Sequence, residues 1–157
     1  MLDIGQCDVF PKVYAKYEYG YTEDEQIVLY TARAITSSPI QISTNFEKFN
    51  DFELSIYCNE EIIAINQDKG AYAAKPYIMI DDGKKKINVL KKKLHNGDYA
   101  LAVFNLGEDF EDVKVYLDDM SEIRDVWAKE NLENADTVNI IGMAPHSARV
   151  FRVKTVI

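Results

Sequence analysis

The sequence predicts a mixed fold, in which a segment of alternating helices and strands is followed by an all-β antiparallel sandwich. Three observations predict it. The 157-residue chain is long enough for one ordinary domain, or for a small domain with a further fragment. The pattern changes near Asp68, from helical caps and short apolar stretches to short alternating strands. After that point turn signals recur, at Asp81–Gly83, Asn96–Asp98 and Leu106–Glu108.

The first element is a helix predicted to run from about residue 23 to residue 36. Thr22-Glu23-Asp24-Glu25 is typical of a capping box, in which the Thr oxygen and the Glu carboxylate satisfy exposed amides reciprocally. One face of this helix is largely apolar and is made by Ile27, Tyr30, Thr31, Ala34 and Ile35. Ser37-Ser38-Pro39 ends the helix, because the residue before a proline avoids the helical region.

Shorter elements follow up to Asp68. Residues 40–43 are predicted to form a strand, Asn50 to start a second helix that runs to about Tyr57, and Asn59 to cap a third helix that runs to about Ile65. Helix and strand alternate here as in βα units, which implies a parallel sheet.

The second half of the chain predicts seven strands of an antiparallel sandwich. The expected ranges are 77–81, 86–94, 98–105, 111–117, 121–128, 136–141 and 147–154. The strand containing Tyr99–Phe104 is apolar on both faces, as for an inner strand. The lysine runs 84–86 and 91–93 flank a short strand, and the sequence favours lysines that protect a sheet edge over a polyanion site.

Composition excludes several function classes. The net charge of −8 argues against nucleic acid and against anionic membrane surfaces as partners. No apolar run approaches the roughly 20 residues of a membrane helix, and the N-terminus has no secretory signal pattern. Cys7 and Cys58 therefore indicate reduced thiols and a cytoplasmic location. No close Cys pair occurs and His95 and His146 have no paired spacing, so neither a metal site nor a cofactor is expected.

Four groups of adjacent carboxylates are candidates for catalysis. Adjacent carboxylates on a strand point to opposite faces, and capping explains the groups at helix starts, so structural roles are favoured for all four. The groups are Glu23/Asp24/Glu25, Glu60/Glu61, Asp81/Asp82 and Asp118/Asp119.

Other candidate residues also favour structural roles. For His146 we expect a hydrogen-bonding role, because no nucleophile partner is identifiable. Trp127 could be a sugar-stacking platform, but its neighbours favour sandwich core. The segment with Tyr14, Tyr17 and Tyr19 could be a sugar-binding rim, whereas a loop that packs its own aromatic side chains is favoured.

Several blocks of sequence together carry a resemblance to a known family. The most specific block is Glu61-Ile62-Ile63-Ala64-Ile65-Asn66-Gln67-Asp68. The others are Met1–Gly5, Tyr21–Gln26, Ser37–Ser43, Leu94–Asn105, Arg124-Asp125-Val126-Trp127-Ala128 and Ala144–Val150. In their order and spacing these blocks resemble the C-terminal part of glycoside hydrolase family 27, the α-galactosidases and α-N-acetylgalactosaminidases.

The resemblance implies two domains. Residues 1–70 would be the C-terminal fragment of a (β/α)8 glycosidase barrel, its last two βα units, and residues 75–157 an antiparallel β-sandwich domain. It also implies a parent enzyme that is a retaining exo-glycosidase acting on α-galactoside-type carbohydrate, with two carboxylates about 5 Å apart. No Asp or Glu of this chain matches either carboxylate, so no catalytic residue is assigned. Met1 is the only position that matches a substrate contact.

Several expectations follow from the resemblance. We expect the chain alone to be catalytically inactive. Two βα units cannot close a barrel, so their apolar faces need a cover. We expect these units to be partly disordered, self-associated, or docked on the sandwich or on a complementing barrel chain. Three function classes stay open: a truncated or split part of a hydrolase, a carbohydrate-binding β-sandwich, and a non-catalytic subunit.

Overall fold

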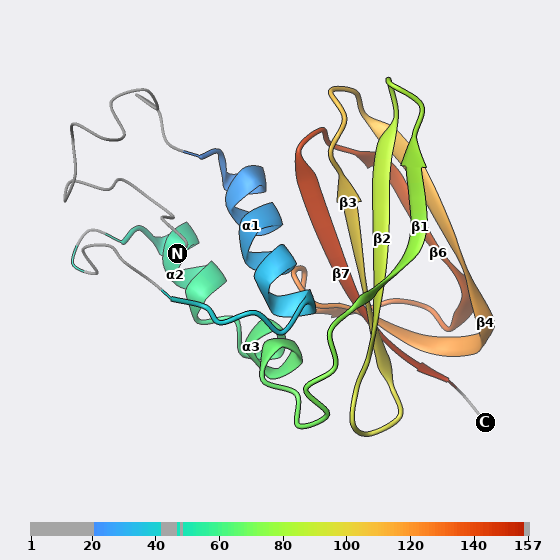
Figure 1. Cartoon of the computed structure of the whole chain (residues 1–157), viewed down its shortest axis with the longest axis horizontal. Coiled ribbons are helices and arrows are strands. Elements are labelled where there is room, and N and C mark those ends of the chain that lie inside the picture. The colour runs from blue at the N-terminus through green and yellow to red at the C-terminus, as the bar shows by residue number, and fades with distance from the viewer. Residues whose placement is uncertain (1–20, 42–46, 48, 156–157) are drawn as a thin grey trace.

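The structure is a computed structural model that describes residues 21–41, 47 and 49–155. Three helices precede an antiparallel β-sandwich, and Figure 1 shows the helices together on one side of the strands. The elements are α1 (Glu23–Ile35), α2 (Asp51–Tyr57), α3 (Glu60–Asn66), β1 (Lys75–Asp81), β2 (Lys86–Lys93), β3 (Tyr99–Asn105), β4 (Glu111–Asp125), β5 (Glu130–Asn131), β6 (Ala135–Met143) and β7 (Ser147–Thr155). Within the described residues no helix is long and apolar enough to cross a membrane.

The three predicted helices are confirmed, and each begins at a side-chain cap. At α1 the Thr22 hydroxyl accepts a hydrogen bond from the Glu25 amide, and Glu25 accepts one from the Thr22 amide. Asn50 and Glu53 form the same reciprocal pair at α2, and Asn59 caps α3. These caps satisfy amides that have no partner inside the helix, which fixes where each helix starts.

The strands form one continuous sheet that folds over on itself. Strands β1, β2, β3, β7, β4 and β5 are neighbours in that order, and β6 pairs with β4 outside this path. Strand β4 belongs to both layers. Its first part pairs with β6 and its last part, Ser121–Asp125, pairs with β7, with an irregularity between Tyr116 and Ser121. This break turns the strand from one layer into the other.

The layer that contains β2, β3 and β7 has a separate apolar core on each of its two faces. Leu101 and Val103 of β3 face the sandwich interior, where they cluster with β2, β4, β6 and β7. Ala100, Ala102 and Phe104, on the other face of β3, cluster with the helices. Strand β3 lies between β2 and β7, so the prediction of an inner strand with two apolar faces is confirmed.

Several details differ from the sequence prediction. The expected strands 111–117 and 121–128 are one strand, β4, followed by a turn, and the short strand β5 was not predicted. Every strand pairing within the described residues is antiparallel, so the parallel sheet implied by the βα alternation is not confirmed. Residues 40 and 41 belong to no strand, and the rest of the expected strand 40–43 lies outside the described residues.

The prediction that the two lysine runs protect a sheet edge is wrong, because the strand that they flank is β2. Strand β2 lies between β1 and β3, so it is not an edge strand. Lys92 is completely buried on the face of β2 that the helices cover, whereas Lys93 is exposed. The sequence did not reveal this difference, because the run of three lysines gives no sign that one of them faces a second layer.

Candidate functional site

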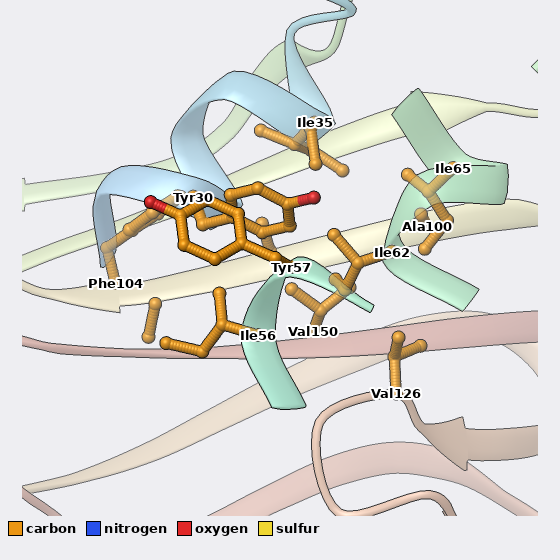
Figure 2. Close-up of a cluster of buried hydrophobic side chains, with 13 residues drawn as sticks. Tyr30, Ile35, Ile56, Tyr57, Ile62, Ile65, Ala100, Phe104, Val126 and Val150 are labelled. Carbon is orange, nitrogen blue, oxygen red and sulfur yellow. The ribbon is translucent and has the colours of Figure 1, made fainter. Parts of the chain in front are cut away.

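The surface on which the helices meet the sandwich is the candidate functional site, and we call it the helix–sandwich junction. Its centre is apolar. Figure 2 shows Tyr30, Ile35, Ile62 and Ile65 of the helices against the sheet that carries Ala100 and Val150. Small alanines on this face of β3 and β7 (Ala100, Ala102 and Ala148) leave room for helices to approach closely, and all three are buried. The larger side chains therefore come from the helices.

The C-terminus of α1 lies in the junction, where its last carbonyl oxygens find partners on other elements. The Arg33 oxygen accepts from Asn66 Nδ2 of α3 at 3.2 Å, and the same amide donates to the Ser38 oxygen at 3.0 Å. The Ile35 oxygen accepts from the Ala74 amide at 3.1 Å. A helix end leaves such carbonyls without internal partners, so these bonds fasten α1 to α3 and to the segment that enters β1.

Lys92 adds to these polar contacts at the helix ends from the sheet side. Its Nζ donates to Ser37 Oγ at 2.8 Å and to the backbone oxygen of Ile65, and it lies 3.5 Å from the Ala34 oxygen. Ser37 has a φ of 55°, the left-handed conformation common just after a helix, and its Oγ donates to the Tyr72 oxygen at 3.0 Å. Burial lowers the pKa of Lys92, and the negative charge of Asp68 opposes this shift.

Two further polar contacts join the helices to the turn after β4. Trp127 Nε1 donates to Thr31 Oγ1 of α1 at 3.0 Å, and its ring lies 6.2 Å from that of Tyr30. Asn59 Nδ2 donates to the Val126 oxygen at 3.3 Å while its side-chain oxygen caps α3. Trp127 therefore packs from the turn against α1. The prediction that it lies in the sandwich core is wrong, because it contacts the cluster that the helices share with the sheet. The strand ends at Asp125, one residue before Val126.

An ion pair at the rim of the junction joins α3 to β4. Arg124 Nε and Nη2 lie 2.6 Å and 2.7 Å from the two carboxylate oxygens of Glu61, which is the bidentate geometry of the stronger ion pairs. The hydrogen bond from Arg124 holds the pKa of Glu61 below its usual value, although burial acts in the opposite direction. Arg124 also donates to Asn131 Oδ1 at 2.9 Å, so β5 supports the pair.

A second polar link joins the segment after α3 to the turn between β2 and β3. The buried Asp68 carboxylate accepts from the His95 amide at 3.0 Å, and His95 Nδ1 lies 2.7 Å from it. Burial alone would raise the pKa of Asp68, but the hydrogen bonds from His95 and from the Gly70 amide outweigh it and hold that pKa low. The carboxylate therefore stays ionised at the junction.

A shallow hollow of about 240 Å³ lies between these two links. Its wall comes from α3, the β2–β3 turn and β7, and its lining includes Glu60, Asp68, His95, Asn96 and Arg152. Arg152 is paired with Asp98 at 2.7 Å, and Asn96 Nδ2 donates to the same carboxylate at 2.9 Å. Of the charged groups that line the hollow, Asp68, His95 and Arg152 are thus already engaged with partners, which suits a structural rim.

The four groups of adjacent carboxylates fall at separate places, as structural roles predict. Glu23, Asp24 and Glu25 lie in the first turn of α1, and Glu61 pairs with Arg124. The Asp81 and Asp82 side chains accept amide hydrogen bonds in the turn after β1. Asp118 pairs with Lys91 at 3.0 Å. None of these contacts places two carboxylates together as an acid and a nucleophile.

The remaining predicted residues are placed as follows. His146 lies in the turn before β7, with a φ of 53° and its Nε2 3.2 Å from the exposed Glu108 carboxylate, and its expected hydrogen-bonding role stays a prediction. In the described part of the chain no three His, Cys, Asp or Glu side chains gather as metal ligands. Met1, Cys7, Tyr14, Tyr17 and Tyr19 lie outside the described residues.

Several junction residues were not predicted as such, although the sequence carried a signal for most of them. Asn66 and Asp68 belong to the block that most strongly carries the family resemblance, and Arg124 and Trp127 belong to another. Both blocks therefore mark residues that join the layers. Lys92 lies outside these blocks and had no such signal.

Comparison with known proteins matches both the sandwich and the helices. Residues 84–153 match the model of the α-galactosidase C-terminal β-sandwich domain. The α-galactosidase of Lachancea cidri is 29% identical over 125 residues, which cover 71% of this chain and 27% of that protein. α-Galactosidase A of Aspergillus niger is 29% identical over 141 residues, covering 85% of this chain and 25% of that protein.

Among solved structures, a family 27 β-L-arabinopyranosidase from Geobacillus stearothermophilus has the same fold. It superposes with a TM-score of 0.79 at 24% identity, over 87% of this chain and 31% of its own. An overlap of 87% extends beyond the sandwich, so the helices share the same arrangement in that protein.

The fold and the junction define a C-terminal β-sandwich domain with a helical layer docked on its outer face. With the matches above, this chain resembles the C-terminal part of the α-galactosidase family, glycoside hydrolase family 27. It spans about a quarter of the length of the curated relatives it matches.

Proposed function

We propose that this chain serves as the C-terminal part of a retaining α-galactosidase-like hydrolase, in which the sandwich supports the end of the catalytic barrel. The observation that carries the proposal is the helix–sandwich junction. Helices and sheet share one buried core, and the same arrangement of both recurs in a family 27 enzyme. A sandwich built only to bind a ligand by itself would not need helices sealed onto its outer face.

We further propose that residues 1–70 are the last two βα units of the barrel. The capped helices α1, α2 and α3, separated by extended segments, support this assignment. The expected need for a cover is met on one side, because α1 and α3 dock on the sandwich. The remaining surface of the helices would contact the other units of a barrel, supplied by the same protein or by a complementing chain.

The hydrolysis itself would be carried out by groups outside the described residues. In a retaining mechanism two carboxylates must lie about 5 Å apart on either side of the scissile bond. The carboxylates of the junction are instead held by Arg124, Arg152 and His95. Because a carboxylate held in an ion pair is a poor proton donor at neutral pH, we expect no turnover from this chain alone.

The test compares this chain with the protein that results when it is joined to a family barrel. The purified chain is assayed with p-nitrophenyl α-galactoside, and then a fusion is assayed in which residues 21–157 replace the matching part of a family α-galactosidase. We expect no turnover by the chain and measurable turnover by the fusion. Turnover by the chain alone would refute the proposal. A soluble but inactive fusion would also count against it, if the same swap from a second relative were active.

The same assay addresses the substrate class. The N-acetyl-α-galactosaminide and β-L-arabinopyranoside analogues are included because one solved relative is a β-L-arabinopyranosidase. Saturable binding of galactose to the chain alone, without turnover, would favour a carbohydrate-binding β-sandwich instead.

A further inference from the structure

The junction contains one fully buried cation, Lys92, among the charged side chains of the described residues. Its side chain extends from strand β2 towards the C-terminal ends of α1 and α3. Its three acceptors come from the last turn of α1, from Ser37 just beyond the C-cap of α1, and from the last turn of α3.

The chemistry of these acceptors explains why a lysine occupies this place. The carbonyl groups at a helix C-terminus carry partial negative charge and have no partner within the helix. The two helix ends converge on Lys92 Nζ, so one ammonium group neutralises both. Burying an ammonium group is unfavourable unless it is fully hydrogen-bonded, and Lys92 meets this condition with one donor for each of its three acceptors.

We propose that Lys92 is the anchor of the helical layer, so that α1 and α3 separate from an otherwise intact sandwich when this side chain is lost. The sandwich has an independent core made by Val89, Leu101, Val103, Val115 and Phe151, none of which depends on the helices for burial against its partners. The helices have no such second core among the described residues. The inference goes beyond the proposed function, because it concerns which layer opens and does not require hydrolysis.

A replacement by an apolar residue does not relieve the junction. Exchanging a buried ion pair for apolar groups can be harmless when both partners are replaced. Here the partners include backbone oxygens of Ala34 and Ile65, which no substitution removes. The Lys92→Met substitution keeps an unbranched side chain as far as Cε, but it removes the ammonium group and leaves these oxygens buried without the donor. The exposed neighbour Lys93 is a matched control for the same substitution.

The test is hydrogen exchange of the full chain followed by mass spectrometry. For Lys92→Met we expect peptides covering residues 27–36 and 60–67 to exchange about tenfold faster or more, which corresponds to the loss of buried hydrogen bonds. Peptides covering β3 and β6 should exchange as in the unmodified chain, and Lys93→Met should change neither group.

Two results would overturn the proposal. Equal acceleration of the helical and the β3 and β6 peptides would mean that Lys92 belongs to a single cooperative core. Rates no different from those of Lys93→Met would mean that the apolar contacts alone hold the helices. If Lys92→Met does not fold, Ser37→Ala removes one acceptor only and should accelerate the same helical peptides to a smaller extent. Equal acceleration of all peptides in Ser37→Ala, or no acceleration at all, would also overturn the proposal.

Discussion

The two faces of strand β3 differ in how they are held. The inner face carries Leu101 and Val103 and is closed by other strands of the same sandwich, mainly through apolar side chains, with Asn105 at its end donating to the Met143 and Ala144 oxygens. The outer face carries Ala100 and Ala102, and it is closed by helices that bring the larger side chains. Hydrogen bonds and an ion pair also hold the helices on this face, and they come from Lys92, Asn66 and Arg124.

This difference teaches which contacts make each layer specific. Apolar packing is not directional, so it can hold a sheet together without fixing how a separate helix is oriented. The polar contacts at the helix ends are directional, so they fix where α1 and α3 lie on this face. We therefore expect inner-face changes to affect the whole chain and outer-face changes to affect the helical layer first.

The largest expected effect is on the inner face. Leu101 is fully buried between the layers of the sandwich, and Leu→Ala changes in such cores cost about 2–5 kcal/mol. We expect Leu101→Ala to lower the free energy of unfolding by that amount and to make all elements unfold together, as measured by urea titration with circular dichroism. The exposed Ile141 is the control, since Ile141→Ala should change stability little. Loss of the helices alone in Leu101→Ala would contradict the comparison.

The next effect tests the close approach on the outer face. Ala102 is buried beneath the helices, and added methylenes in a packed core cost about 1–3 kcal/mol. We expect Ala102→Leu to destabilise the chain by that amount and to accelerate hydrogen exchange in α1 and α3 more than in β6. If β6 exchanged faster by the same factor, the two faces would not be energetically separate.

The helices and strands could be predicted from the sequence because their signals are local. The caps at Thr22, Asn50 and Asn59 and the two apolar faces of Tyr99–Phe104 depend only on near neighbours in the chain. The merging of two expected strands into β4 could not be predicted, because β4 changes its pairing partner between Tyr116 and Ser121. A change of partner depends on the assembled sheet and not on the local sequence.

The junction could be predicted only in part. Asn66 and Arg124 lie in blocks that resemble the family, but their partners Arg33 and Glu61 are distant in sequence, and pairing across such distances leaves no periodic pattern. Lys92 was misread because exposure, and not residue type, distinguishes it from Lys91 and Lys93. Which lysine faces the helices depends on the register of β2 with β3, and that register is a property of the assembled sheet.

A smaller effect is expected from the amide that ties α3 to α1. Asn66 Nδ2 serves both the Arg33 and the Ser38 oxygens, and leaving such acceptors unsatisfied costs about 1–3 kcal/mol. We expect Asn66→Ala to fall near the lower end of that range, because the Arg33 oxygen also accepts from the Ser38 amide at 3.0 Å. Thermal unfolding followed by circular dichroism measures the change, and Gln67→Ala on the next position is the control. An effect as large as that of Leu101→Ala would show that the polar contacts dominate the stability of the chain.

The smallest effect is a dependence on acidity confined to the rim. The pKa values of Glu61 and Asp68 are lowered in the folded chain, Glu61 mainly by the hydrogen bond from Arg124 and Asp68 by hydrogen bonds that outweigh its burial. A carboxylate with a lowered folded-state pKa contributes stability that is present above its unfolded-state pKa and is lost as the pH falls through the folded-state value. We therefore expect exchange in α3 to accelerate as the pH falls below about 4, after correction for the intrinsic rate, before β3 responds. Glu61→Gln should reduce the dependence of the α3 exchange rate on pH, because one of the two titrating carboxylates is removed. Glu122→Gln is the control, since Glu122 belongs to an exposed pair on the sandwich and its loss should leave that dependence unchanged. A profile for Glu61→Gln that matches the unmodified chain at every pH would show that the Arg124 pair does not hold α3 in place.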